Sequence, residues 1–190
     1  MIISISGKIC SGKDTVAAII QELQPEMNWE VKKFAGKLKT IASMLSNTPI
    51  EKFEDQEFKK LDMAPEWGMT YREFLQRLGT EAMRVGLHEN VWVNALFSNY
   101  KSTEVKDRYF NWPNWIITDC RFPNELDSVI YRSGYTIKVV RDSGNTIGTT
   151  HPSETALDGY TDWTFVIDNN GTIEELKEQV KQILQKIILG

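Results

Sequence analysis

The chain opens with an apolar run, and a helical pattern follows it. Ile2 to Ser6 is short, rich in isoleucine and bounded by a glycine, which predicts a buried first strand. Between Asp14 and Leu23, apolar side chains recur at helical spacing until Pro25 ends the pattern, which predicts an amphipathic helix. Segments with one or the other of these two patterns recur along the rest of the chain. Further strands are predicted at 29–34, 115–118, 135–140 and 163–167, and further helices at 37–45, 71–82, 88–100, 124–130 and 172–187.

Some helix starts carry their own signals. The capping-box pattern, Thr followed three residues later by Glu, occurs at Thr48–Glu51, Thr70–Glu73 and Thr172–Glu175. The first of these predicts an additional short helix through Phe58. Asn124 is expected to cap the helix that follows strand 115–118. The polar stretches 101–111 and 143–150 are expected to be loops.

Strands that alternate with helices over a whole chain indicate an α/β fold, with a parallel sheet of about five strands covered by helices on both faces. Ligands of such sheets bind beyond the carboxyl ends of the strands. Most of the unusual polar residues of the chain fall at those ends, in the segments 7–12, 34–39, 119–125, 141–154 and 168–171. We therefore expect the functional site at this edge of the sheet.

The first of these segments matches a phosphate-binding loop. Gly7 to Lys13 has the spacing G-x-x-x-x-G-K, between a predicted strand and a predicted helix. Backbone N–H groups of such a loop and the helix N-terminus bind phosphates, so Lys8, Ser11 and Thr15 are expected to contact them as well. Lys13 would neutralise the β- and γ-phosphates. Alternatively, the two glycines serve only a tight turn.

One position departs from the usual motif. The loop normally closes with Ser or Thr, whose hydroxyl binds magnesium, and here Asp14 takes that place. A carboxylate is a better ligand for a hard cation than a hydroxyl, so Asp14 is predicted to bind Mg²⁺. Asp119 ends the strand WIITD, where phosphate-loop enzymes keep a second carboxylate of the magnesium site. The competing interpretations are that Asp14 is a helix cap and Asp119 a turn residue.

A second phosphate held against the first requires cations between the two. Arg121 follows Asp119 by two residues, so we expect it to clamp a phosphate in the same crevice, with Glu125 as its partner; alternatively, the two form a surface ion pair. Arg141 precedes the loop 143–150 and is expected to close over ATP. Other candidate contacts for the accepting molecule are Phe34, Lys37, Arg72, Gln76, Arg84 and Trp92. Phe34 and Trp92 could equally be core residues, and Lys37 part of a solvated helix start.

Composition narrows the function classes. The chain has 190 residues, enough for one domain, and a net charge of −4 with no basic block, which argues against a nucleic-acid partner. No apolar run reaches the length of a membrane span, and no signal peptide is expected, because the N-terminus lacks a basic region and runs directly into the glycine loop. The two cysteines lack metal-ligand spacing and are expected to be buried in a protein of the reducing cytoplasm. The oligomeric state stays open, with a homodimer among the options.

Together, the motifs resemble a known family. GKICSGKDT at 7–15, FAGKLK at 34–39, YREFLQRLGTE at 71–81, TDCRFPNE at 118–125 and HPSE at 151–154 are similar to the bacteriophage-type deoxynucleoside monophosphate kinases. The resemblance implies a phosphate-loop fold of the nucleoside-monophosphate-kinase type, ATP with Mg²⁺ as donor, and a deoxynucleoside 5′-monophosphate as acceptor. Small-molecule nucleotides would be the partners, in the host cytoplasm if a phage encodes the chain.

The resemblance also implies roles for regions and residues. Residues 1–190 would form a single kinase domain, with a helical acceptor-binding region at about 36–100 and a short lid at about 141–154. Lys13, Arg72, Asp119 and Arg121 would be catalytic, and Ser153 and Glu154 of the HPSE motif would lie near the substrate. Two other classes remain open. One is a small-metabolite kinase of the same fold, of the phosphomevalonate or dephospho-coenzyme A type, and the other is a nucleotide-binding module without transfer activity.

Overall fold

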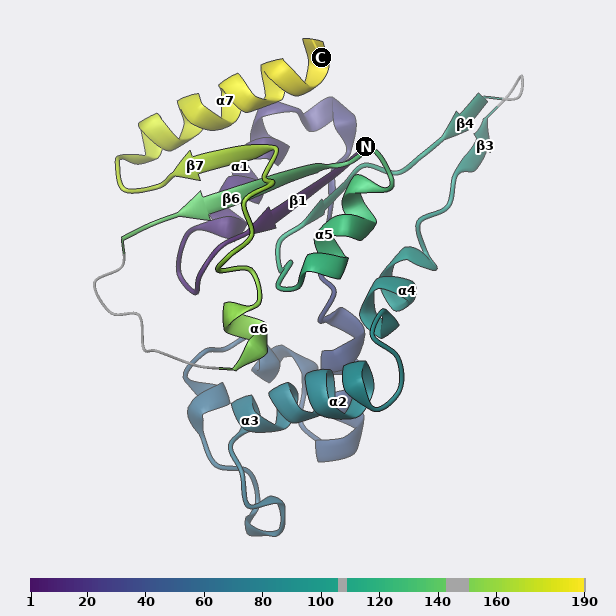
Figure 1. The fold of residues 1–190 in the computed structure, drawn as a ribbon, viewed down its shortest axis with the longest axis vertical. Coiled ribbons are helices and arrows are strands. Elements are labelled where there is room, and N and C mark those ends of the chain that lie inside the picture. The colour runs from purple at the N-terminus through teal and green to yellow at the C-terminus, as the bar shows by residue number, and fades with distance from the viewer. Residues whose placement is uncertain (106–108, 143–150, 190) are drawn as a thin grey trace. The chain divides into compact units, whose positions relative to one another are not determined.

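The computed structural model describes residues 1–105, 109–142 and 151–189. The chain divides into two compact units. Met1–Lys33 together with Tyr100–Gly190 form one, which we call the core unit, and Phe34–Asn99 form the other, which we call the helical unit. Figure 1 labels the α-helices and many of the strands of both units.

The core unit contains a five-stranded parallel sheet with the order β2-β5-β1-β6-β7, as the strand and helix pattern predicted. The strands are β1 (Ile2–Ser6), β2 (Glu30–Lys32), β5 (Trp115–Ile117), β6 (Tyr135–Val140) and β7 (Phe165–Asp168). The central strand β1 is buried along its whole length. In its register with β6, Ser6 pairs with Lys138, which places Lys138 beside the start of the glycine loop.

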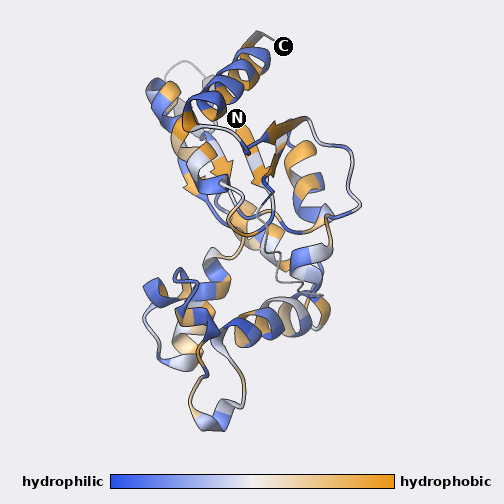
Figure 2. Ribbon diagram, turned by 90° about the vertical axis from the view of Figure 1, so that its left-hand side faces the viewer, coloured by the Kyte–Doolittle hydropathy of each residue, from blue (hydrophilic) through white to orange (hydrophobic). Residues whose placement is uncertain are grey.

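Helices cover both faces of this sheet. α1 (Lys13–Leu23) and α7 (Ile173–Leu189) pack against each other and against the side chains of Ile3 and Ile5. α5 (Pro123–Ile130) packs against β1 and β6 on the opposite face, as Figure 1 shows. Figure 2 shows the apolar residues of the core unit concentrated in the strands and on the sheet-facing sides of these helices, as a two-layered core requires.

The rest of the core unit includes a difference from the sequence prediction. Within 101–111, expected to be a loop, β3 (Thr103–Val105) and β4 (Tyr109–Asn111) pair in an antiparallel arrangement. The threonine, valine, tyrosine and phenylalanine of these short segments favour strands, which the polar composition of the stretch as a whole obscured. A 3₁₀ turn, η1 (Pro25–Met27), and a short helix, α6 (Pro152–Thr155), complete the unit.

The helical unit has a small core of its own, formed by Ala42, Phe53, Met63 and Phe74. Its elements are α2 (Gly36–Ser46), the 3₁₀ turns η2 (Ile50–Phe53), η3 (Phe58–Lys60) and η4 (Pro65–Trp67), α3 (Tyr71–Gln76), the π-helix η5 (Arg77–Val85), and α4 (Val91–Phe97). Gly79 in η5 faces Leu38, and a Cβ at Gly79 would lie 2.8 Å from a Leu38 methyl group. Close packing of two helices therefore explains this glycine.

Two of the predicted caps are correct and two are wrong. Thr70 and Thr172 each accept a hydrogen bond from the backbone N–H three residues later, at 3.2 Å. Thr48 instead donates to the carbonyl of Ser46, and only a 3₁₀ turn follows. Asn124 lies inside α5, because Pro123 already occupies the first helical position and Glu125 takes up the free N–H groups before it. No helix in the described ranges is long and apolar enough to cross a membrane.

Candidate functional site

The loop between β1 and α1 has the backbone shape of a phosphate cradle. Gly12 precedes the first residue of α1 with a φ of 98°, a conformation that favours glycine. A Cβ at Gly7 would collide with the carbonyl oxygen of Val139, so this position also requires glycine. Asp14 is the second residue of the helix and is exposed, and no side chain caps α1. The interpretation of Asp14 as a helix cap is therefore wrong.

Lys13 bends back across the loop. Its ammonium group donates to the carbonyl oxygens of Gly7, at 2.9 Å, and Lys8, at 2.7 Å. Burial lowers the pKa of Lys13, and the nearby positive charge of Arg121 lowers this pKa further. Two cations from different segments therefore approach each other, and an anion between them would relieve their repulsion.

The hydroxyl of Ser11 independently tests whether the loop fits a phosphate. Only 2% of this residue is exposed, and its hydroxyl forms no hydrogen bond with any part of the chain that the structure describes. A buried hydroxyl without a partner is costly. A phosphate oxygen in the loop would accept this hydrogen bond, so the residues present fit the phosphates of a nucleotide.

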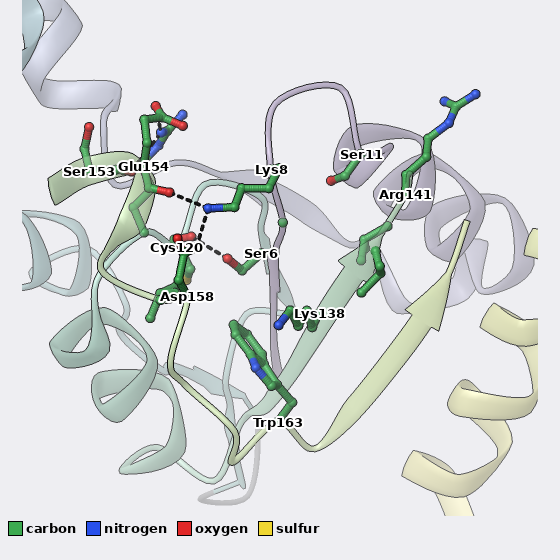
Figure 3. Close-up of a pocket in the computed structure, with 15 residues that line it drawn as sticks. Ser6, Lys8, Ser11, Cys120, Lys138, Arg141, Ser153, Glu154, Asp158 and Trp163 are labelled. Carbon is green, nitrogen blue, oxygen red and sulfur yellow. Dashed lines mark hydrogen bonds and ion pairs between the residues drawn. The ribbon is translucent and has the colours of Figure 1, made fainter. Parts of the chain in front are cut away.

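A cavity of about 210 Å³ lies beside the loop. It is lined by residues from the end of β1, from β6, from the segment after β5, and from the stretch that begins at α6 (Figure 3). The charged residues in its wall are Lys8, Arg121, Lys138, Arg141, Glu154 and Asp158. Four cations against two carboxylates leave the lining positive although the protein as a whole is acidic. This excess favours an anionic ligand.

Arg121 does not pair with the partner expected from the sequence. Its guanidinium group donates to the carboxylate of Glu154 and, at 3.0 Å, to the carbonyl oxygen of Ser153. Glu125 is buried and accepts the backbone N–H groups of Arg121, at 2.7 Å, and Phe122, at 3.2 Å. As the third residue of α5, Glu125 turns back to the helix start, as the glutamate of a capping box does. The expected side-chain pair between Arg121 and Glu125 is therefore wrong.

Glu154 and Asp158 also hold the glycine loop. The ammonium group of Lys8 donates to the carbonyl oxygen of Glu154, at 2.8 Å, and to the carboxylate of Asp158. Figure 3 shows these contacts at one side of the cavity. The segment that begins at α6 therefore contacts both the loop and Arg121. Ser153 and Glu154, predicted near the substrate, do line this cavity.

The two predicted magnesium ligands, Asp14 and Asp119, could hold Mg²⁺ only if a substrate and water supplied its remaining ligands. Asp14 is the second residue of α1, and Asp119, which follows β5, is half-buried. Among the described residues, no group of three or more His, Cys, Asp or Glu side chains could hold a metal ion. Mg²⁺ commonly binds one or two carboxylates and takes its remaining ligands from phosphates and water. Two carboxylates near a phosphate loop fit that pattern.

The cysteines divide between buried and exposed positions. Cys120 is buried, and burial raises the pKa of its thiol, with Glu125 and Asp119 as smaller causes. Cys10 is exposed in the glycine loop with a φ of 62°. The expectation that both cysteines are buried is wrong for Cys10, because residues 8–10 of the loop are exposed.

The remaining predicted acceptor contacts lie in the helical unit. Phe34 packs against Phe97, with ring centroids 6.1 Å apart, and Trp92 donates to the carbonyl oxygen of Gly79 at 2.9 Å. Arg84 is buried and donates to the carbonyl oxygen of Glu89 at 3.0 Å. Arg72, which bonds Gln56, and Gln76 are half-buried, and Lys37 is exposed. Contact of these six side chains with an acceptor stays a prediction.

Several residues of the cavity were not singled out from the sequence. Lys138 and Trp163 lie together at one end of it, with the ammonium group 5.8 Å from the ring centroid (Figure 3). Lys138 could have been found from the sequence, because it is the lone charge in the strand YTIKVV. No sequence pattern singled out Trp163. Arg141 lines the cavity, but its guanidinium group points away from Lys8 and Glu154. The predicted lid loop 143–150 lies outside the described residues.

Comparisons with known proteins agree with this geometry. The family model described as deoxynucleotide monophosphate kinase matches residues 33–180. A protein of Acanthamoeba polyphaga mimivirus described as a "Putative deoxynucleotide monophosphate kinase" is 30% identical over 188 residues, which cover 95% of this chain and 94% of that protein. Shikimate kinase from Aquifex aeolicus VF5 has a similar fold, with a TM-score of 0.54 at 12% identity over 100% of this chain and 99% of that one.

Proposed function

Since the chain belongs to the deoxynucleotide monophosphate kinase family, we propose that it transfers the γ-phosphoryl group of ATP to a deoxynucleoside 5′-monophosphate with the help of Mg²⁺. The similarity to the viral relative extends over nearly the whole length of both chains. The family therefore disfavours a small-metabolite kinase and a non-catalytic module. The relative comes from a giant virus, and a bacteriophage origin of this chain is not shown.

The positive lining of the cavity beside the glycine loop is the observation that carries the proposed mechanism. Lys13 is the first residue of the helix that follows this loop, and Arg121, in the segment after β5, lines the cavity. Phosphoryl transfer depends mainly on positioning and charge neutralisation. Lys13 would exchange the carbonyl oxygens of Gly7 and Lys8 for phosphate oxygens. Arg121 would bind the transferring group with its planar guanidinium, which matches phosphate geometry.

The metal would be held between the loop and the end of β5. We propose Asp14 and Asp119 as its protein ligands, directly or through water, because Asp14 lies in the first turn of α1 and Asp119 follows β5, the strand that pairs with β1. When bound, Mg²⁺ would supply positive charge that offsets the negative charge developing on the transferring phosphate. Ser11 would donate to a phosphate in the same loop.

The helical unit is proposed to bind the acceptor. Arg72 and Gln76 lie one helical turn apart, so they can contact one ligand together. Lys37 and Arg84 would add positive charge, and Phe34 and Trp92 would contact the base, if the side chains that now pack inside the unit become accessible. Arg141 is proposed to contact ATP, and residues 141–154 to act as a lid.

The cellular setting follows from the substrates. We propose that the protein acts in the cytoplasm, or in the host cytoplasm if a virus encodes it, because ATP and deoxynucleotides are available there. Its partners are then small nucleotides, and its net charge of −4 does not favour nucleic acid. A homodimer is compatible with this function.

An ADP-release assay with a panel of acceptors tests the proposal. The panel contains the four deoxynucleoside monophosphates, the matching ribonucleotides, phosphomevalonate, dephospho-coenzyme A and shikimate. We expect ADP release with at least one deoxynucleoside monophosphate, and none when Lys13→Ala replaces the wild type. Transfer to a metabolite alone would identify the other kinase class, and ATP binding without any transfer would identify a binding module.

A further inference from the structure

Asn169 lies far from the glycine loop in the sequence, but its side chain bonds the loop in the structure. It directly follows β7, is 9% exposed, and donates from its side-chain amide to the carbonyl oxygen of Ser11 at 2.8 Å. Its own backbone N–H donates to the carbonyl oxygen of Val140 at 2.8 Å. The side chain is therefore anchored where β6 and β7 end, at a fixed distance from the loop.

The geometry of the peptide bond gives this contact a consequence for ligand binding. The Ser11–Gly12 peptide is planar and trans, so its N–H points opposite to its C=O. Because Asn169 holds the Ser11 oxygen, the Gly12 N–H is directed away from Asn169. In a phosphate loop, backbone N–H groups of this segment are the donors that bind phosphate oxygens.

The same side chain explains why Gly12 has no room for a substituent. A Cβ at Gly12 would collide with the amide nitrogen of Asn169, in addition to the strain of the φ of 98°. The amide thus packs against the Cα of Gly12 while it bonds the preceding carbonyl. Both contacts oppose a rotation of the Ser11–Gly12 peptide, which would turn its carbonyl oxygen toward the phosphates.

We propose that Asn169 is a positioning residue for the donor nucleotide, which orients the Ser11–Gly12 peptide so that the Gly12 N–H binds a phosphate of ATP. The proposal rests on the proposed kinase function of the loop. Asn169 does not touch the reacting atoms, and its effect passes through the peptide that it holds. Loss of its amide donor weakens the binding of phosphate and leaves the acceptor site unchanged.

Two variants remove the donor in different ways. Asn169→Asp keeps the shape but presents an oxygen in place of the NH₂ group, and Asn169→Ser shortens the side chain so that it no longer reaches Ser11. The matched control is Asn170→Ala, because Asn170 is the exposed neighbour that bonds Asp168 and the backbone of Asp142 instead of the loop. Thermal unfolding of each variant identifies those that fold.

The readouts are the KM for ATP, the KM for the deoxynucleoside monophosphate, kcat, and the affinity for ADP by calorimetry. A hydrogen bond of this kind is worth roughly a factor of ten in binding, so we expect the KM for ATP and the Kd for ADP to rise about tenfold in a folded Asn169 variant. The KM for the acceptor is expected to stay within about twofold, and Asn170→Ala to match the wild type.

An equal rise in the KM for ATP and the KM for the acceptor, or no change in either, would overturn the proposal. If Asn169→Asp does not fold, Asn169→Ser decides, and if both unfold at the assay temperature, Asn169 is a general stability residue and the proposal fails. A wild-type protein that neither binds ADP nor transfers phosphate would instead refute the proposed function, so the two failures are distinguishable.

Discussion

Arg121 forms its ion pair with Glu154, thirty-three residues further along the chain, and not with Glu125, four residues away. The carboxylate of Glu125 accepts hydrogen bonds from the backbone N–H groups of Arg121 and Phe122, which precede α5. The guanidinium group of the proposed phosphate clamp is thus paired with a carboxylate of α6. A phosphate that binds Arg121 must compete with Glu154 or share the guanidinium group with it.

The competition between Glu154 and phosphate predicts tighter nucleotide binding in Glu154→Gln. This variant keeps the side-chain shape but removes the charge that pairs with Arg121 and stabilises the charged form of Lys13. Partly exposed ion pairs contribute about 0–1 kcal/mol, so we expect the Kd for a non-hydrolysable ATP analogue, which carries the phosphoryl group that Arg121 is proposed to bind, to fall by up to about fivefold. Calorimetry measures the Kd, with Glu174→Gln on the exposed start of α7 as the control. An unchanged or higher Kd would show that Glu154 does not compete with the nucleotide.

Lys13 gives a prediction about stability as well as catalysis. Its pKa is lowered in the folded protein, mainly by burial, so between that lowered value and the ordinary pKa the unfolded chain binds more protons than the folded chain. The free energy of unfolding of the ligand-free protein is therefore expected to gain a contribution as pH rises through this interval. Lys13→Met should lack this contribution. Denaturant unfolding at several pH values measures the difference between wild type and variant.

The same substitution separates stability from function. Lys13→Met should remove phosphate transfer, because a positive charge that stabilises the transition state is lost, at a cost of several kcal/mol. The exposed Lys181→Met on α7 is a matched control for the loss of one lysine. Turnover like that of the wild type in Lys13→Met would contradict the assignment of the phosphate loop. Equal pH dependence of stability in both variants would contradict the effect of Lys13 burial.

Much of the fold could be predicted from the sequence because its signals are local. The apolar run at 2–6, the helical periodicity from Asp14 and the caps at Thr70 and Thr172 each depend on neighbouring residues, and each is present in the structure. The antiparallel pair of β3 and β4 was missed because its strands are short and lie in a stretch that is polar as a whole. Asn124 was misassigned because proline at the first helical position determined the start of α5.

The site was less predictable because its contacts join segments far apart in the chain. The glycine loop is a local pattern, and its position after β1 follows from the sequence alone. The contacts of Lys8 with Asp158 and of Asn169 with Ser11 span about 150 residues or more, and no spacing rule indicates them. Arg121 illustrates the difference, since its place in the cavity was predicted but its partner was not.

Asp14 predicts a change in magnesium dependence. Asp14→Asn removes the carboxylate charge at the start of α1, so a higher Mg²⁺ concentration should be needed for the half-maximal rate. Asp14→Ser supplies the hydroxyl that is usual at this position of the loop. The Mg²⁺ concentration needed for its half-maximal rate should therefore lie between those of Asp14→Asn and the wild type. A Mg²⁺ titration of the initial rate measures both variants, with the exposed Asp162→Asn as control. Identical titration curves for all four proteins would remove Asp14 from the metal site.

Arg121→Lys decides whether Arg121 acts on the transferring phosphoryl group or only pairs with Glu154 at the surface. A lysine keeps the charge but presents a single ammonium in place of the planar fork, which suits the equatorial oxygens of the transferring group. We expect the Kd for ATP to stay nearly unchanged and kcat to fall roughly a hundredfold, as when preorganised stabilisation of a transition state is lost. Arg132→Lys is the control, because Arg132 lies at the end of α5 and bonds Ser128. A surface pair is worth only about 0–1 kcal/mol, so a kcat within about fivefold of the wild type would remove Arg121 from the reaction.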